Sequence, residues 1–248
     1  MKFYTLFLIL FFTSCSHSDN LLVHIPEASG ICYEKKTNSL FVANDEGTVY
    51  EIDTAGKILR KKRLGKYDLE GVACDSDKGK LYFAVEKKDN VLVVNQKNFA
   101  IVKEIEIKRK FKKLKILKKD RKHGLEAISI TPEGIYLSNQ SFKKYPQEDP
   151  SVLLKIDSID KRKTVIKKII DHGYIDISGM SFYHNYLYMV SDTDNLLIKY
   201  DLKNQQTLST KKLPQAAYEG VTFDDKGYIY FADDDGRILK QSFKGFFK

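Results

Sequence analysis

The chain has 248 residues, 42% of them hydrophobic, and a formal net charge of +9 at pH 7. Residues 108–122 alone contain ten Lys or Arg and one Asp, so this segment carries the whole net charge and the remainder is neutral. Positive charge confined to one segment is not the pattern of a nucleic-acid-binding domain, and we expect no nucleic-acid partner. The length allows a large core in one domain or two.

The first 14 residues have the features of a secretory signal peptide, with one Lys, an apolar run and small residues before Cys15. The tetrapeptide Phe12-Thr-Ser-Cys15 resembles the lipobox of bacterial lipoproteins, in which the cysteine becomes the acylated first residue, although Phe12 stands where Leu is usual. We therefore expect lipidation at Cys15, a lipid-tethered linker over residues 15–20, and a cell-envelope location on the periplasmic or outer surface of a bacterial membrane. An ordinary signal or a signal anchor is the alternative.

A repeat that occurs five times occupies the rest of the chain. Each copy has Glu or Ser before a short apolar strand, then a turn and a second strand that ends in polar residues. The copies begin at Ser29, Glu70, Glu126, Ser178 and Glu219, which are 41, 56, 52 and 41 residues apart. A period near 40 residues with short strands predicts β-propeller blades.

Each blade is predicted to contain four antiparallel strands bounded by Gly, Asn and Asp. The strands are 29–33, 40–43, 48–53 and 57–64 in blade one, 70–74, 81–85, 91–95 and 99–107 in blade two, strands near 126 and 135 with 152–157 and 164–170 in blade three, 177–182, 187–190, 196–201 and 207–213 in blade four, and 219–223, 228–232 and 237–243 in blade five. Because blade five lacks a fourth strand and residues 21–25 form a spare one, we expect the N-terminal strand to close the last blade. The predicted fold is an all-β, five-bladed β-propeller over residues 21–248.

Two insertions lengthen the spacing between copies. In the basic insertion, residues 108–122, the apolar residues Phe111, Leu114 and Leu117 recur every three residues, so both a short amphipathic helix and a solvated loop fit the segment. Attraction to anionic lipid of the membrane, or to another acidic surface, is one expected role. Residues 141–151 contain two prolines and predict a loop.

Two cysteines remain after Cys15. Cys32 falls in a column of the aligned repeat that is occupied by small residues, and Cys74 falls in the next column, which is occupied by core hydrophobes. Because neighbouring columns point to opposite faces of a strand, the sequence predicts two buried free thiols rather than a disulfide.

Carboxylates recur at the start of the first strand of every blade. Three blades open with Glu, and the two blades that open with Ser have an acid two residues earlier. One blade that opens with Glu also has an acid two residues earlier, Asp68, so the six candidates are Glu27, Asp68, Glu70, Glu126, Asp176 and Glu219. Residues i and i+2 share a face of a strand, and the first strand of each blade lines the central channel, so we expect all six to converge at one mouth.

Carboxylates held close together must take up protons, spread into water or bind a cation. An oxygen-only set favours Ca²⁺, which tolerates irregular geometry, and no His or Cys except His123 lies near the set, so zinc is a poor fit. The alternative is that these acids cap turns and accept hydrogen bonds from backbone amides. A second oxygen-rich column follows the second strand of each blade, at the opposite end of the neighbouring strand. Its members are Asn44, Asp45, Glu86, Asn139, Gln140, Asp192, Asp233 and Asp234.

The repeated segments resemble those of the SdiA-regulated (YjiK-like) lipoproteins over almost the whole chain after the signal. The segments are Pro-Glu27-Ala-Ser-Gly-Ile, Tyr-Asp68-Leu-Glu-Gly-Val, Gly-Leu-Glu126-Ala-Ile, Asp176-Ile-Ser-Gly-Met and Tyr-Glu219-Gly-Val-Thr-Phe. The resemblance implies a five-bladed propeller that is distantly similar to NHL-repeat proteins, with a calcium site and an exported, membrane-associated location. It supplies no established reaction.

Two classes of function fit these features. The first is a non-enzymatic, calcium-binding module that is tethered to the envelope and binds or senses a protein or small molecule. The second is a calcium-dependent hydrolase, such as a lactonase, a phosphotriesterase or a phytase-like esterase, in which the metal polarises a substrate oxygen and orients water. The sequence offers no convincing general base, since a lone His such as His123 beside a turn is usually a surface residue. We therefore favour the binding module and assign no catalytic residue.

Overall fold

The computed structural model describes residues 20–118 and 123–247, which form 22 β-strands and one 3₁₀ turn, Glu86–Lys88. The predicted signal peptide, residues 1–14, and the predicted lipidation site, Cys15, lie outside the described residues. Within the described part of the chain, no helix has the length and apolar character needed to span a bilayer.

Three sheets contain four antiparallel strands each. The first consists of β2 (Ala28–Glu34), β3 (Ser39–Asn44), β4 (Thr48–Asp53) and β5 (Ile58–Arg63), and the second of β16 (Ile177–Tyr183), β17 (Tyr186–Ser191), β18 (Leu196–Asp201) and β19 (Gln206–Lys212). The third consists of β20 (Tyr218–Phe223), β21 (Tyr228–Asp233), β22 (Arg237–Ser242) and the N-terminal strand β1 (Leu21–His24). Because β1 pairs antiparallel with β22, the prediction that the N-terminal strand completes the last sheet is confirmed.

The fourth large sheet contains eight strands, where the sequence predicted two separate blades. Its strands are β6 (Leu69–Asp75), β7 (Lys80–Val85), β8 (Asn90–Asn95), β9 (Ile101–Lys108), β12 (Leu125–Thr131), β13 (Gly134–Asn139), β14 (Leu153–Ile156) and β15 (Lys163–Ile170). The two halves are joined by a parallel pairing of β15 with β9. β9 lies between the two partners: one edge pairs with β8, and residues Glu106 to Lys108 use the other edge to pair with β15, so that Glu106 pairs on both sides.

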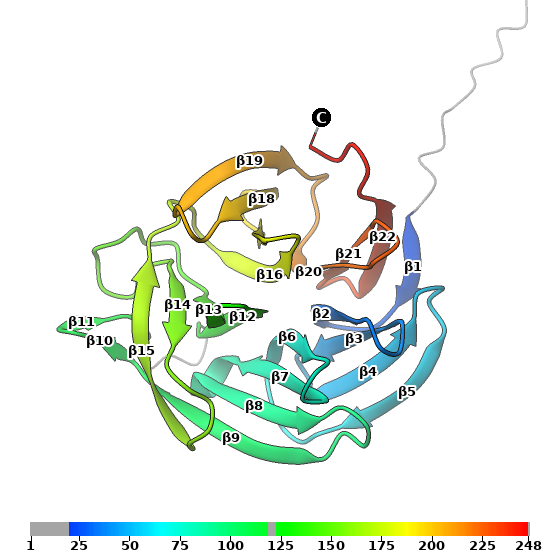
Figure 1. Cartoon of the computed structure of the whole chain (residues 1–248), viewed down its shortest axis with the longest axis horizontal. Coiled ribbons are helices and arrows are strands. Elements are labelled where there is room, and N and C mark those ends of the chain that lie inside the picture. The colour runs from blue at the N-terminus through cyan, green and yellow to red at the C-terminus, as the bar shows by residue number, and fades with distance from the viewer. Residues whose placement is uncertain (1–19, 119–122, 248) are drawn as a thin grey trace, which may run out of the picture.

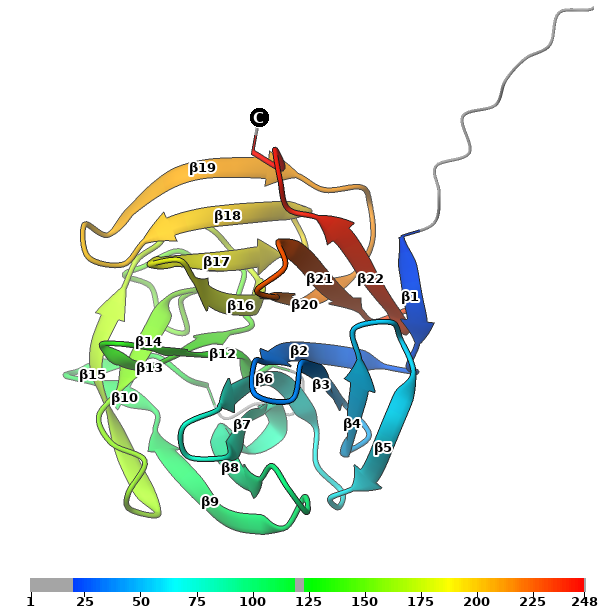
Figure 2. The same cartoon turned by 45° about the vertical axis from the view of Figure 1, so that its right-hand side comes forward.

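The sheets surround a common centre (Figures 1 and 2). One strand of each four-stranded sheet, and one strand of each half of the eight-stranded sheet, is innermost. The innermost strands β2, β6, β12, β16 and β20 contact one another in sequence, and β20 contacts β2, so the ring is closed. Apolar side chains fill the space between neighbouring sheets. Phe41 of β3 and Phe83 of β7, for example, belong to one fully buried cluster. This arrangement is a β-propeller.

The innermost strands approach most closely at a ring of small residues, which we call the waist. Its members are Gly30, Gly71, Ala127, Gly179 and Gly220. A Cβ atom on Gly71 would lie 2.7 Å from the backbone Cα atom of Ala127, a distance that a real Cβ atom does not reach. The waist leaves no space for a water molecule, so it separates the two mouths of the ring.

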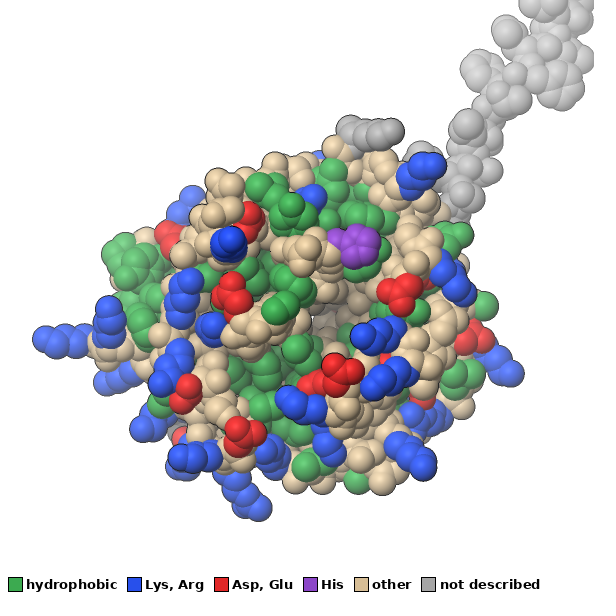
Figure 3. All heavy atoms as spheres, viewed as in Figure 1, with side chains coloured by type: hydrophobic (Ala, Val, Ile, Leu, Met, Phe, Trp, Pro, Cys, Tyr) green, Lys and Arg blue, Asp and Glu red, His purple; other side chains and the backbone are tan. Residues whose placement is uncertain are grey.

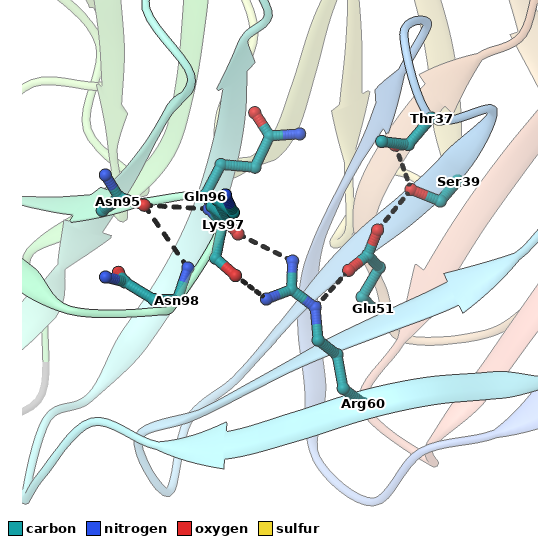
Figure 4. Close-up of polar contacts among 8 residues, drawn as sticks. All are labelled: Thr37, Ser39, Glu51, Arg60, Asn95, Gln96, Lys97 and Asn98. Atoms are coloured by element: carbon teal, nitrogen blue, oxygen red, sulfur yellow. Dashed lines mark hydrogen bonds and ion pairs between the residues drawn. The ribbon is translucent and has the colours of Figure 1, made fainter.

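An arginine joins the first sheet to its neighbour at the outside of the ring (Figure 4). The Nε atom of Arg60 lies 2.5 Å from a carboxylate oxygen of Glu51, which is buried. Its other two nitrogens donate hydrogen bonds to the backbone carbonyls of Gln96 and Lys97 in the turn after β8, and its guanidinium lies 4.1 Å from the ring centroid of Phe99. Arg60 therefore points inward and binds two sheets together.

The described part of the basic insertion is not helical. Lys110–Phe111 (β10) and Leu114–Lys115 (β11) pair as a short hairpin, so the helix alternative is wrong for these residues, and 119–122 lie outside the described residues. The apolar residues that recur every three positions, and that suggested a helix, reflect packing of the hairpin segment on the core. Ile116 and Leu117 are buried in the core, and their backbone N–H groups donate to the carbonyl of Arg109, which closes the hairpin.

Cys32 and Cys74 form a disulfide, with their Cα atoms 5.8 Å apart, so the prediction of two free thiols is wrong. The pleat of a strand relates side chains only within that strand and its hydrogen-bonded partners. Cys32 lies on β2 and Cys74 on β6, which belong to different sheets and meet side by side at the centre of the ring. Packing therefore sets their relative register, and the repeat alignment gives no guide to it.

The waist generates a test of the fold. We expect Gly71→Ala to lower the free energy of unfolding by about 3 kcal/mol or more, because the new methyl group meets backbone atoms that cannot move aside. The matched control is Gly79→Ala, whose added Cβ meets nothing within 4 Å and which suffers only from its φ of +58°, at about 1–2 kcal/mol. Urea denaturation measures both, and equal losses would show that the strands are not in contact at Gly71.

Candidate functional site

One mouth of the ring contains an acidic cavity of about 150 Å³. Its lining consists of Ser29, Asp45, Glu70, Glu86, Glu126, Gln140, Glu219 and Asp234. Six of these eight residues are carboxylic acids, and no Lys, Arg or His is among the described residues of the lining. Three of the six predicted acids, Glu70, Glu126 and Glu219, thus lie together as expected.

The other three acids of the cavity come from the second oxygen-rich column. The innermost strand and the next strand of each sheet are antiparallel, so the end of one lies beside the start of the other, as Ala28 lies opposite Asn44. Asp45, Glu86 and Asp234 follow the ends of β3, β7 and β21 and are brought to the same mouth as the glutamates. Part of each column therefore contributes to a single site.

Three of the four glutamates of the cavity lie one residue before a member of the waist, which limits how far apart they can be. Glu70 and Glu219 precede Gly71 and Gly220, and Glu126 precedes Ala127. Because the backbones touch at the waist, these side chains have little freedom to separate, and Glu126 is only 4% exposed. The structure thus concentrates negative charge where the strands are closest.

The two blades that carry Ser at this position use it differently. The hydroxyl of Ser29 donates to the backbone carbonyl of Leu69 on β6, and the hydroxyl of Ser178 donates to the carbonyl of Tyr218 on β20 at 2.6 Å. Each serine therefore links its inner strand to that of the next sheet. At this position of the repeat, the three glutamates place carboxylates in the cavity, and the two serines use their hydroxyl groups to join neighbouring inner strands.

Glu27 and Asp176 do not line the cavity, contrary to the argument that residues i and i+2 share a face. Both residues precede their strands and have positive φ angles, +50° and +53°, so the backbone is not extended there and the rule does not apply. Glu27 is exposed. The carboxylate of Asp176 accepts hydrogen bonds from the backbone N–H and the hydroxyl of Thr193, and so caps a turn.

Asp68 occupies an intermediate position. One carboxylate oxygen each from Asp68, Glu70 and Glu86 lie within 4.8 Å of one another, a grouping that could hold a metal ion. Asp68 also forms an ion pair with Lys87 at the edge of the site. It is therefore a neighbour of the cavity that contributes charge to one side of it.

The remaining residues of the second column have other environments. Asn44 donates to the carbonyl of Pro26 and accepts from the N–H of Thr48, so it holds two turns together. Asp233 is fully buried and forms an ion pair with Arg237 at 2.6 Å. Asn139 is buried, and neither of its side-chain polar atoms has a hydrogen-bond partner among the described residues. Asp192 lines a separate surface depression with Thr193 and Asn195.

Burial and mutual repulsion change the acidity of the cavity. Burial first, and then neighbouring carboxylates, raise the pKa of Glu70, Glu126 and Glu219 well above the usual value; for Glu126 the strongest repulsion comes from Glu70 and Glu219. The same two causes raise the pKa of Asp45 to about 6 and that of Glu86 to about 7. A positive charge placed among these groups would favour their ionised forms.

The donor set fits a hard divalent cation. All the side chains that line the cavity offer oxygen, with the amide of Gln140 and the hydroxyl of Ser29 beside the six carboxylates. The Oδ1 atom of Asp45 is buried and accepts no hydrogen bond within the described residues, which leaves it available to a ligand. His123 is not among the described residues that line the cavity. Calcium, which accepts six to eight oxygen ligands in irregular geometry, suits this set better than zinc.

The opposite mouth has a different chemistry. It contains a cavity of about 330 Å³. Its apolar and aromatic lining includes Ile31, Tyr33, Val72, Ile128, Met180 and Phe223. The disulfide between Cys32 and Cys74 forms part of the wall, and Lys35, Asp75 and Asp77 contribute charges of both signs. Figure 3 looks onto this side of the ring, toward which the β2–β3 turn projects, and shows it hollowed at its centre.

Comparisons with known proteins agree with this fold. The family model of the SdiA-regulated proteins matches residues 21–235. A glutaminyl cyclase from Myxococcus xanthus has a similar structure, with a TM-score of 0.56 and 12% identity over 87% of this chain and 89% of that one. A luciferin-regenerating enzyme gives a TM-score of 0.55 and 14% identity over 89% and 74% of the two chains. The β-propeller domain of Cps50 (Swd1) from Myceliophteria thermophila gives 0.48 and 11% over 87% and 65%. The comparison with curated proteins finds no match.

The raised pKa values predict how stability depends on pH. A carboxyl group whose folded pKa exceeds its unfolded value of about 4 binds its proton more tightly in the folded state, so its stabilising effect is present at low pH and is lost as the pH rises through the folded pKa. We therefore expect the melting temperature of the metal-free protein to fall between about pH 5 and about pH 8. Glu126→Gln removes one such group and should flatten the curve, whereas Glu148→Gln, at an exposed loop residue, should not. A melting temperature that rises over this range would contradict the assignment.

Proposed function

The chain belongs to the SdiA-regulated family, and from this premise we propose that it is an exported, membrane-tethered propeller that binds Ca²⁺ at the acidic mouth and a partner at the other. The observation that carries the proposal is the acidic cavity of about 150 Å³. Six carboxylic acids line it, and no Lys, Arg or His is among its described lining residues. A divalent ion relieves their repulsion and joins inner strands from several sheets. Its role is therefore to hold the ring in one conformation.

The proposal includes five blades of four strands. The eight-stranded sheet then counts as two blades, β6 to β9 and β12 to β15, whose outermost strands pair in parallel. Each blade contributes one of the innermost strands that contact one another in a cycle. Calcium at the acidic mouth is shared among blades in this arrangement, so that binding and ring closure support each other.

The disulfide supports export. Disulfides persist in oxidising compartments and are rare where thiol reductants are abundant. The chain has three cysteines, and with Cys32 and Cys74 joined, Cys15 is the remaining one. This pattern agrees with a cysteine at the predicted lipobox that is reserved for acylation, and with a lipid-anchored propeller in the cell envelope.

The opposite mouth supports a binding or sensing role. Its cavity, about 330 Å³, is large enough for a small molecule or a side chain of a partner protein. The waist separates it from the acidic cavity, so the calcium ion and the partner would occupy separate sites. Calcium acts on the partner site through the inner strands, which run from one mouth to the other.

One observation favours the hydrolase as a second candidate. Glu86 lies at the acidic cavity, and in the metal-free protein burial and the neighbouring carboxylates raise its pKa to about 7; a bound cation would favour its ionised form, the form that a general base needs. A metal held by the glutamates would place polarised substrate oxygen and water beside it. Calcium-dependent hydrolysis of lactones or phosphate esters that is lost in Glu86→Gln would establish this function, whereas unchanged turnover in that variant would exclude Glu86 as the base.

Calcium binding is tested by thermal unfolding with calcium or with chelator. At a calcium concentration 100 times the dissociation constant, binding adds about 2.7 kcal/mol, which corresponds to a rise of roughly 5–10 °C for a domain of this size. Glu126→Gln and Glu219→Gln should lose most of this rise because each removes a charged ligand from the cavity. Glu148→Gln serves as the control and should keep it, and an unchanged melting temperature of the parent protein with calcium would refute the proposal.

A further inference from the structure

We propose that the outer strand β5, with the adjoining start of β1, is the surface that lies against the anionic headgroups of the membrane. The proposal rests on the proposed function, because it takes the lipid at Cys15 as the tether. It differs from the expectation that the basic insertion, residues 108–122, faces the membrane. The argument uses the charge of β5, its exposed apolar residues and the place where the tether joins the ring.

The charge of β5 is unusual among the outer strands. Residues 57–63 contain five Lys or Arg and no acid, more than the three Lys of β15 or the two Lys of β19, which also lack acids, while β9 contains two Lys and two Glu. Arg60 is used internally by Glu51 and the turn after β8. The other four cations, Lys57, Lys61, Lys62 and Arg63, are exposed, and none forms an ion pair with a carboxylate within the described residues. Lys62 donates a long hydrogen bond to the carbonyl of Asn98, and Lys61 lies over the ring of Tyr50, but neither contact neutralises a charge, so all four charges can attract phosphate groups of lipids.

Apolar side chains accompany these charges. Ile58 is 43% exposed and Leu59 is 50% exposed, next to Lys57 in the sequence. Leu21, at the start of β1, is 47% exposed. A surface that combines cations with exposed aliphatic side chains binds the interface of an anionic membrane through both headgroups and acyl chains.

β5 and β1 are neighbours in space. The turn that leads into β5 packs against β1, since Gly56 lies close to the backbone carbonyl of Leu22. The ammonium group of Lys240 on β22, the partner of β1, donates a hydrogen bond to the carbonyl of Thr54 in the same turn at 2.8 Å. The exposed residues of the two strands therefore adjoin one surface region.

The tether enters the ring at this region. The carbonyl of Asn20 accepts a hydrogen bond from the N–H of Lys240, so the chain joins the fold beside β22 and β1. Four residues lie between Cys15 and Asn20, and the five steps from one to the other, at roughly 3.3–3.6 Å each when extended, span no more than about 18 Å. In Figures 1 and 2, β5 lies on the same side of the ring as β1, whereas β10 of the basic hairpin lies on the far side. A short tether thus brings β5 to the membrane and keeps the basic hairpin away from it.

The test uses the absence of tryptophan from the chain, so that a single Leu59→Trp substitution is a unique fluorescent reporter. The full lipidated chain is bound to vesicles of phosphatidylcholine and phosphatidylglycerol whose acyl chains are brominated. We expect these lipids to quench the L59W fluorescence at least twofold. The control Leu208→Trp places the same reporter at a residue 42% exposed on β19, another outer edge strand, and should not be quenched.

Charge reversal gives the second arm. Lys57→Glu, Lys61→Glu and Lys62→Glu combined in the L59W chain should abolish its quenching, whereas Lys110→Glu, Lys112→Glu and Lys113→Glu on the basic hairpin should leave it unchanged. Equal quenching of L59W and L208W, or equal quenching of L59W on vesicles of phosphatidylcholine alone, would overturn the proposed surface. Circular dichroism checks that each variant is folded.

A third measurement separates this proposal from the one on which it rests. The mass of the chain from bacterial membranes shows whether Cys15 is acylated. An unacylated chain refutes the tether and, with it, the argument for β5 from tether length. An acylated, vesicle-bound chain without L59W quenching leaves the tether intact and refutes only the docking surface.

Discussion

The structure depends on the contact of inner strands at a waist of small residues. At Gly71 the backbone of one strand touches that of the next so closely that a methyl group has no place. This contact closes the ring, separates its two mouths and sets the spacing of whatever side chain precedes it in each strand. Because glutamates precede the waist on three strands, closing the ring brings negative charges together. The acidic cavity is thus a direct consequence of how the ring closes.

The cavity in turn explains why a cation is expected. Six carboxylic acids lie around about 150 Å³, and burial and repulsion raise the pKa of Glu70, Glu126 and Glu219 well above the usual value. A divalent ion would offset part of this repulsion, which is the reason for the cation proposed above. The opposite mouth, lined by apolar residues and by charges of both signs, has no such concentration of like charge.

The repeat alone predicted most of the fold, because its strands follow the alternation of apolar residues and the turns between them. It also predicted closure by the N-terminal strand, since the last sheet would otherwise have three strands and β22 a free edge. Three of the six acids that line the cavity were predicted to lie at this mouth. Glu70, Glu126 and Glu219 were found from their column, but Glu27 and Asp176 were misplaced, because a positive φ before a strand cannot be read from spacing. Asp45, Glu86 and Asp234 were assigned to a separate column, although the antiparallel pairing that unites the two is implicit in the predicted hairpins. The disulfide and the β15–β9 pairing depend on contacts between sheets, on which a repeat is silent.

The central claim is that ring closure creates a cation site. The most direct measurement is a crystal structure from crystals grown in calcium, with anomalous diffraction to locate the ion. The account predicts one anomalous peak at about 2.3–2.6 Å from carboxylate oxygens of glutamates in the cavity, Glu126 and Glu219 among them. Carboxyl groups that are hydrogen-bonded to one another in pairs, with no peak between them, would contradict it.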